Sequence, residues 1–96
     1  MYKRQALDVE AGRVLTYQAA NKIDRGDQDV IVAAMAKIKA TDAAMRVSTE
    51  AITIAGISGM DPNKLLERIF RDAKAGQIYE GTNQIQRMLI ARSLLK

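Results

Sequence analysis

The longest helical pattern in this chain of 96 residues runs from about residue 28 to residue 55. Apolar residues recur through it at helical spacing, and many of the positions between them are alanines. Alanine favours helix and, being small, lets a neighbouring helix approach closely. These alanines are Ala33, Ala34, Ala36, Ala40, Ala43 and Ala44. An apolar face this wide predicts that other helices pack on two sides of this one.

A first helix is expected over residues 3–24, ahead of the long one. Gly12 lies inside it and predicts the close approach of another helix, since glycine otherwise costs a helix about 1 kcal/mol relative to alanine. Gly26 can end this helix, and Asp27 or Asp29 can cap the next, which predicts a tight helical hairpin. The apolar stripe expected on the first helix consists of Leu7, Ala11, Val14, Leu15, Gln18 and Ile23.

Two shorter helices are expected in the second half of the chain. Asp61 as N-cap and Pro62 at the first helical position predict a helix over residues 62–74. The last helix is expected over residues 82–95, with Thr82 as its N-cap. The sequence therefore predicts an all-α fold, in which residues 1–96 form a single antiparallel helical bundle.

The composition narrows the possible chemistry. The chain has neither cysteine nor histidine, which removes the thiolate nucleophile, the commonest metal ligand and the commonest general base. Catalysis would rest on a carboxylate, lysine, tyrosine or serine, and we expect no metal site. No signal peptide and no run long enough to span a membrane is visible, so we expect a cytoplasmic protein.

The net charge of +4 permits a polyanionic partner without requiring one. Basic residues follow one side of the third expected helix: Lys64, Arg68, Arg71 and Lys74. No DNA-binding motif accompanies them and aromatic residues are scarce, so this side is interpreted as a solvated face. We expect no nucleic-acid partner.

One carboxylate, that of Glu80, stands between Tyr79 and Gly81, just before the expected N-cap. Gly81 allows a sharp turn or the close approach of a bound molecule. Ile78 and Tyr79 offer apolar walls, and a carboxylate that loses hydration becomes a stronger base. These residues alone leave two interpretations open: a capped surface turn that happens to contain a glutamate, or a catalytic base.

The sequence blocks around Glu80 resemble the carboxyl-terminal signature of flavin-dependent acyl-CoA dehydrogenases. The RDAK block at residues 71–74 and the IYEGTNQIQR block at residues 78–87 occur in the family's order and spacing. The resemblance extends more weakly back to the first helix, so it covers nearly the whole chain. It implies that Glu80 removes the α-proton of an acyl-CoA thioester while the β-hydrogen leaves as hydride to the flavin.

The resemblance also implies roles for the neighbours of Glu80. Tyr79 would line the acyl pocket, and Gly81 would let the acyl chain pass beside the base. Thr82, Asn83 and Gln84 match positions that touch FAD.

A second set of cofactor contacts is implied at the end of the long helix. Thr53, Ile54, Ala55, Gly56 and Ile57 match positions that contact the FAD bound mainly by a neighbouring subunit. The chain departs from the family here, because the family usually has glutamine in place of Thr53, glycine in place of Ile57 and asparagine at the next position. A branched side chain at position 57 would force a shift where the backbone approaches a ligand.

The resemblance further implies that this chain is part of a larger architecture. In the family, this region is preceded by a helical domain, a β domain and the first helix of a four-helix bundle, which together supply most flavin and CoA contacts. We therefore expect the 96-residue chain alone to show no dehydrogenase activity and no stoichiometric FAD. A bundle that lacks its first helix exposes an apolar groove, which predicts a homo-oligomer, either a dimer or a tetramer.

The presence of Glu80 favours the more usual family branch, which acts on straight acyl chains, and leaves acyl-CoA oxidases and decarboxylating relatives open. A dehydrogenase would pass its electrons to an electron-transfer flavoprotein, and an oxidase would pass them to oxygen. The competing hypothesis is a non-catalytic helical interaction or oligomerisation module, or a diverged family member. Thr53 and Ile57 favour that hypothesis, whereas the intact block over residues 79–87 opposes it.

Overall fold

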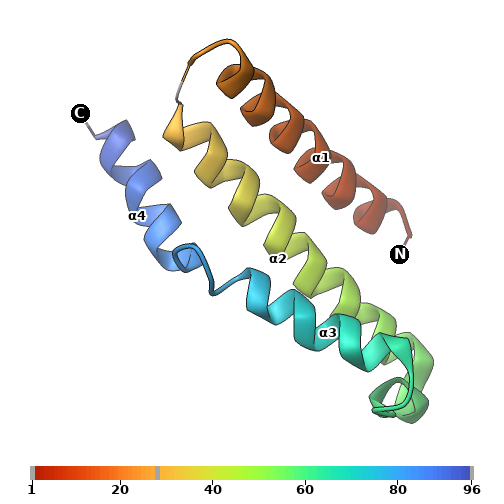
Figure 1. Ribbon diagram of the computed structural model, residues 1–96. Coiled ribbons are helices and arrows are strands. Elements are labelled where there is room, and N and C mark those ends of the chain that lie inside the picture. The colour runs from red at the N-terminus through yellow and green to blue at the C-terminus, as the bar shows by residue number, and fades with distance from the viewer. Residues whose placement is uncertain (1, 28, 96) are drawn as a thin grey trace.

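The computed structural model describes residues 2–27 and 29–95, and every regular element in this part of the chain is helical. Helix α1 spans Tyr2–Asp24 and α2 spans Val30–Ala55; a short 3₁₀ helix, η1, follows at Gly56–Met60. Helices α3 and α4 span Leu65–Gly76 and Asn83–Leu94 (Figure 1). The predicted all-α fold is confirmed. None of the described helices is both long and apolar enough to cross a membrane.

Helix α2 is the centre of the arrangement. Helix α1 runs antiparallel along one side of it, and α3 and α4 follow each other end to end along the other side, both antiparallel to α2 (Figure 1). Among the described residues, no Cα atom of α1 lies within 8 Å of α3 or α4. The prediction that helices pack on two sides of the long helix is confirmed.

The connection between α1 and α2 is fixed by Asp29. Its Oδ1 accepts hydrogen bonds from the backbone N–H groups of Ile31 and Val32 at 3.0 and 3.2 Å, so it caps α2 as predicted. Its Oδ2 accepts a hydrogen bond from Lys22 Nζ at 2.8 Å, which ties the end of α1 to the start of α2. Gly26, with a φ of +80°, turns the chain after α1. The predicted start of α2 at residue 28 lies outside the described residues.

Small residues bring α1 and α2 together. A Cβ atom at Gly12 would lie 3.3 Å from the Cα of Ala40, so the two backbones pass too closely for a side chain there. This confirms the close packing predicted at Gly12. Asp8 is buried one helical turn before it and pairs with Lys39 at 3.1 Å and with Arg46, both on α2.

The predicted apolar stripe of α1 is only partly buried. Ala11 and Leu15 are half-buried, whereas Leu7 and Val14 are 68% and 55% exposed, and the fully buried positions are instead those of Gly12 and Ala19. The axes of two helices approach most closely through their smallest side chains, and on α1 these lie beside the apolar stripe rather than within it. Leu7 and Val14 are left facing outward.

The chain as a whole buries little apolar surface. Within residues 3–27 and 29–95, the buried hydrophobic side chains are all alanines: Ala19, Ala34, Ala36 and Ala43. The radius of gyration is 15.4 Å, against about 13 Å for a compact domain of this length. The accessible surface is 6927 Å², against roughly 5,500 Å² for a compact monomer of this size. The difference exceeds the roughly 800 Å² that one partner buries in a standard protein interface.

Helix α3 begins later than predicted. The Oδ1 of Asp61 accepts a hydrogen bond from the N–H of Asn63 at 2.9 Å, and its carbonyl accepts one from the N–H of Lys64 at 3.0 Å. These bonds close a turn over residues 61–64, and the helix starts at Leu65. The predicted start at Pro62 is therefore wrong, because the side chain expected to cap a helix is used in the turn.

Candidate functional site

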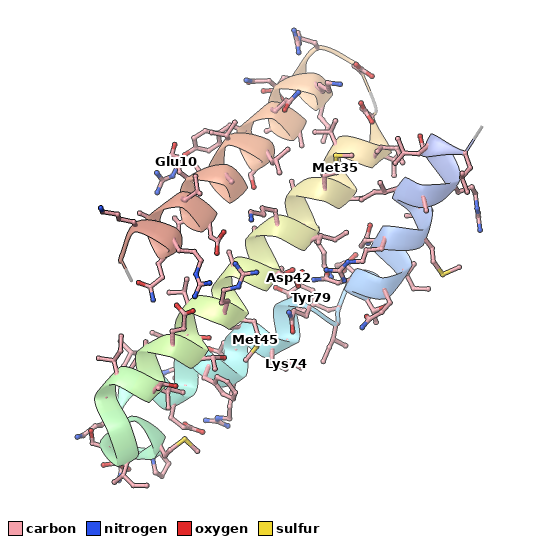
Figure 2. The ribbon with its side chains drawn as sticks, turned by 180° about the vertical axis from the view of Figure 1, so that it is seen from behind. Glu10, Met35, Asp42, Met45, Lys74 and Tyr79 are labelled. Atoms are coloured by element: carbon pink, nitrogen blue, oxygen red, sulfur yellow. The ribbon has the colours of Figure 1, made fainter. Side chains whose placement is uncertain are left out.

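Glu80 lies in the connection between α3 and α4, residues 77–82, beside the middle of α2. Figure 2 labels Tyr79 in this connection and Asp42 on α2 near it. Glu80 has a φ of +55° and the following Gly81 a φ of +90°. A positive φ is uncommon for residues other than glycine, so the backbone that carries this carboxylate is strained and must be held by its surroundings.

Side chains from two helices hold this turn. Gln86 Nε2, on α4, donates to the carbonyl oxygens of Glu80 and Gly81 at 3.1 and 3.5 Å. Lys37 Nζ, on α2, donates to the carbonyl oxygen of Gly81 at 2.8 Å. The carbonyl groups of Glu80 and Gly81 therefore both accept hydrogen bonds from side chains on the neighbouring helices.

Asn83 fastens the start of α4 to α2. It is only 3% exposed, and its Nδ2 donates to Thr41 Oγ1 at 2.9 Å and to Asp42 Oδ1 at 2.7 Å. Its Oδ1 accepts a hydrogen bond from Lys37 Nζ at 2.7 Å, and its backbone N–H donates to the carbonyl of Gln77 at 3.1 Å. The polar atoms of this side chain are thus engaged within the chain.

Asp42 is the shared acceptor of this network. Its Oδ1 accepts hydrogen bonds from Gln77 Nε2 at 2.8 Å and from Asn83, and its Oδ2 accepts one from Arg87 at 2.6 Å. Partial burial raises the pKa of Asp42, but the hydrogen bonds from Gln77, Asn83 and Arg87 outweigh it, so the pKa is lowered. A carboxylate stabilised in this way is a poor base, and it serves to join α2, the turn and α4.

The predicted N-cap of α4 is also part of this site. Thr82 Oγ1 accepts a hydrogen bond from the backbone N–H of Ile85 at 3.3 Å, so the prediction is confirmed. Thr82 borders a polar hollow of about 350 Å³ together with Lys74, Gln84 and Arg87.

The carboxylate of Glu80 is exposed and accepts no hydrogen bond from the described residues. Its backbone N–H likewise donates to no group in that part of the chain. Ile78 and Tyr79 are both largely exposed, so the apolar walls expected around the carboxylate are not closed by this chain. The carboxylate and the N–H of Glu80 are therefore both without a partner among the described residues.

An open groove of about 380 Å³ lies next to Tyr79, between α2 and α3. Its lining is largely apolar: Ala40, Thr41, Ala44, Ile69, Asp72, Ala73, Gly76 and Tyr79. A Cβ atom at Gly76 would lie 3.2 Å from Thr41 Cγ2, so a side chain at position 76 would crowd the floor of the groove. The shape and lining suit an aliphatic chain better than a polar ligand. The carboxylate within the lining is Asp72.

The family described as "acyl-CoA dehydrogenase, C-terminal domain" matches residues 3–95. This chain belongs to that family. It is 48% identical over 91 residues to cyclohexane-1-carbonyl-CoA dehydrogenase of Geobacter metallireducens, a match that covers 95% of this chain and 24% of that protein. It is 44% identical over 97 residues to a probable acyl-CoA dehydrogenase of Mycobacterium tuberculosis, covering 100% of this chain and 25% of that protein.

Two solved structures share the fold of this chain. Butyryl-CoA dehydrogenase of Megasphaera elsdenii matches with a TM-score of 0.91 and 45% identity, over 95% of this chain and 24% of that chain. A chain in the structure of the electron-transferring flavoprotein of Acidaminococcus fermentans matches with a TM-score of 0.93 and 44% identity, over 98% of this chain and 25% of that chain. This chain thus spans about a quarter of the length of the curated relatives it matches.

The residues to which the resemblance assigns roles lie in two separate places in the structure. Residues 79–84 lie together at the α3–α4 connection, whereas residues 53–57 lie at the far end of α3 (Figure 1). Helix α3 has 12 residues and is therefore about 18 Å long. One copy of the chain does not bring the two segments together.

The segment over residues 53–57 is exposed throughout. Thr53 Oγ1 donates to the carbonyl of Thr49 at 3.1 Å, and Ile57 is 90% exposed. Gly56 has a φ of +74°, and a Cβ atom there would meet nothing within 4 Å. The segment offers an open apolar surface with few hydrogen-bond donors, which fits contact with a cofactor held mainly by other groups.

Sequence reasoning missed the residues that shape the turn around Glu80. Gln86 was inside the recognised block but received no role, and its spacing of six residues from Glu80 was the signal available. Lys37 and Asp42 lie on α2, far from Glu80 in the sequence, and no local pattern connected them to it. Only the packing of α4 on α2 brings them to the site.

Proposed function

We propose that this chain is the C-terminal domain of a flavin-dependent acyl-CoA dehydrogenase, which forms an α,β double bond in an acyl-CoA thioester with Glu80 as the base. The observation that supports this most is the placement of Glu80. Its carboxylate has no partner among the described residues and belongs to a turn held from two helices, and the preceding residue, Tyr79, lines an apolar groove.

In this proposal, Glu80 acts through two groups. Its carboxylate takes the α-proton, which becomes abstractable when the thioester carbonyl is hydrogen-bonded. Its backbone N–H, which no described residue engages, donates to that carbonyl oxygen and stabilises the negative charge that develops there. FAD, when bound, accepts the β-hydrogen as hydride.

Substrate and cofactor contacts follow from the same turn. Tyr79 and Gly81 contact the acyl chain, and Tyr79 lines the apolar groove that would receive it. Thr82 and Gln84 border the polar hollow and would contact FAD. Asn83 is assigned to holding those two residues in place, because its own side chain is satisfied by α2.

The segment over residues 53–57 would contact a second FAD, bound by a neighbouring copy, since α3 separates it from Glu80. This arrangement makes the enzyme a homo-oligomer, a dimer or a tetramer, and the large exposed surface of the chain supports association. A chain that is a quarter of its relatives' length would lack most flavin and CoA contacts. We therefore expect the 96 residues alone to be inactive and free of FAD.

The electron acceptor in this proposal is an electron-transferring flavoprotein. The structural relative from Acidaminococcus fermentans occurs in a structure described as such a flavoprotein, which supports this choice over oxygen. The proposal places the enzyme in the cytoplasm, as expected from the sequence.

The test is the Glu80→Gln variant of the holoenzyme that carries this chain. Flavin and acyl-CoA binding should persist, while the rate of flavin reduction by acyl-CoA should fall by about 10²- to 10⁴-fold. The matched control is Asp72→Asn, which removes the carboxylate that lines the groove and should reduce the flavin at a near-normal rate. The reverse pattern would assign the base to Asp72.

A second candidate is a non-catalytic helical interaction or oligomerisation module. The observation that favours it is the excess of exposed surface, together with the exposed Ile57 in the segment that departs from the family. Both candidates associate into oligomers, so the two are separated by measuring flavin reduction by acyl-CoA rather than by the oligomeric state. A module would associate into a defined oligomer while Glu80→Gln changes no measurable reaction of the longer protein.

A further inference from the structure

Glu80 and Gly81 adopt a backbone conformation that residues other than glycine rarely take. Both residues have a positive φ, of +55° and +90°, and Glu80 is the one residue other than glycine with this property among the described residues. The direction of the Cα–Cβ bond follows φ, so a return of Glu80 to a negative φ would point its carboxylate elsewhere. Whatever holds this φ also aims the carboxylate.

The hydrogen bonds to the two carbonyls are suited to hold it. The peptide group between Glu80 and Gly81 carries the carbonyl oxygen that accepts from Gln86 Nε2 at 3.1 Å. The next carbonyl, that of Gly81, accepts from Lys37 Nζ at 2.8 Å and from Gln86 Nε2 at 3.5 Å. If either peptide plane rotated, its oxygen would leave these donors and the donors would lose their partners.

The packing around the turn supports the same conclusion. A Cβ atom at Gly81 would lie 2.8 Å from Gln86 Nε2, so the amide of Gln86 rests directly on the glycine. Lys37 Nζ also donates to Asn83 Oδ1 at 2.7 Å, which links the turn to the buried start of α4. The turn is thus fixed from α2 and from α4 at the same time.

We propose that Gln86 and Lys37 are positioning residues for Glu80: their hydrogen bonds to the carbonyls of Glu80 and Gly81 fix the peptide planes that aim the carboxylate at the substrate. This inference rests on the proposed function, in which Glu80 is the base. Neither residue touches the reacting atoms, and their effect passes through the backbone of the turn. A displacement of about 1 Å in a catalytic group lowers rates by as much as about 10²-fold.

The test uses Gln86→Met and Lys37→Met in the holoenzyme, since methionine keeps side-chain length and removes the donor. Each variant should bind FAD and acyl-CoA with affinities within about threefold of the parent, while flavin reduction at saturating substrate falls by about 10- to 100-fold. The kinetic isotope effect with α-deuterated acyl-CoA should rise, because proton removal becomes slower relative to the other steps. Lys37→Arg, which restores a donor, should recover part of the rate.

The matched control is Lys39→Met on the same helix. Lys39 pairs with Asp8 at 3.1 Å, so this variant removes an ammonium group that contributes to stability without touching the turn. Flavin reduction and the isotope effect should remain at the parent values. An equal loss of rate in Lys39→Met would overturn the proposal, as would a parent-like rate and isotope effect in both methionine variants.

Loss of folded, FAD-containing protein in both Gln86→Met and Lys37→Met would also overturn the proposal, in favour of a purely structural role for the two residues. Failure of the proposed function is recognised separately, because Glu80→Gln would then still reduce its flavin. If Glu80→Gln abolishes reduction and the methionine variants do not slow it, only the positioning roles are lost.

Discussion

Two segments of this chain contain a glycine with a positive φ among residues to which the family resemblance assigns roles, and the two segments are held in opposite ways. The turn over residues 79–84 receives hydrogen bonds from α2 and α4, and its Asn83 is buried. The segment over residues 53–57 makes hydrogen bonds within its own helix and is exposed throughout. The conformation of the first segment is therefore held by hydrogen bonds from other parts of the same chain.

The comparison shows which part of a divided site this chain can build alone. At the turn, the donors, the acceptors and the strained backbone all come from one polypeptide, so the backbone conformation at Glu80 is held by this chain itself. At residues 53–57, the chain provides an exposed surface that no other described element covers. Substitutions should therefore act on stability at the turn and on cofactor binding at the other segment.

The largest effect on stability is expected from Asn83→Ala. It would leave Lys37, Thr41 and Asp42 without a shared partner and should lower the free energy of unfolding of the chain by about 2–3 kcal/mol. Urea unfolding followed by circular dichroism measures this. The matched change is Ser58→Ala, whose hydroxyl donates to the carbonyl of Ala55 at 3.0 Å on the exposed side, with an expected effect within about 0.5 kcal/mol. Equal losses of stability in Asn83→Ala and Ser58→Ala would contradict the claim that the turn is held more firmly than the exposed segment.

A double-mutant cycle between Gly81→Ala and Gln86→Ala should show a coupling of about 1 kcal/mol, since the new methyl group and the amide of Gln86 compete for the same space. Each glycine substitution alone should cost about 1–3 kcal/mol because of its positive φ. In the control cycle, Gly56→Ala with Gln86→Ala, the costs should add, because nothing lies within 4 Å of a Cβ at Gly56. Additivity in both cycles would contradict the close contact at Gly81.

Low pH should lower the stability of the chain, and part of that decline should come from the protonation of Asp42. The lowered pKa of Asp42 means that its contribution to stability is complete above its ordinary pKa of 3.8 and is lost as the pH falls through the lower value of the folded state. Asp42→Asn should therefore show a smaller decline in stability below pH 3.8 than the parent. Residues 53–57 contain no titratable side chain and should not contribute to this decline. Identical acid profiles of the two proteins would refute the role of Asp42.

The smallest effect on stability is expected at Thr53. Thr53→Ala removes an exposed hydroxyl that donates to the carbonyl of Thr49, and the free energy of unfolding should change by no more than about 0.5 kcal/mol. In the holoenzyme, the same substitution should weaken FAD retention, measured by equilibrium dialysis. A stable variant with parent-like FAD affinity would show that position 53 makes no contact with the cofactor.

The sequence predicted the helical fold because its signals there are local. The caps at Asp29 and Thr82 and the close packing at Gly12 depend on nearby residues and on side-chain size, and the structure confirms them. The pair Asp61 and Pro62 misled the prediction of α3, since the same side chain can close a turn as readily as cap a helix.

The sequence did not predict which side of α1 meets α2. Periodicity locates an apolar stripe but does not identify its partner, and Leu7 and Val14 face outward. At the candidate site, the position of Glu80 came from the family resemblance, while its support by Lys37 and Asp42 did not. Those contacts join residues about 40 positions apart and exist only after α4 has packed on α2.

The way in which α2 holds Asn83 also limits where the chain can change length. Lys37 and Thr41 stand one helical turn apart on α2, and both bond to the same amide. Inserting or deleting a single residue between them would rotate one against the other by about 100° and separate them around the helix. The turn that carries Glu80 is thus in register with α2, and insertions that preserve this register belong in the loops at either end of that helix.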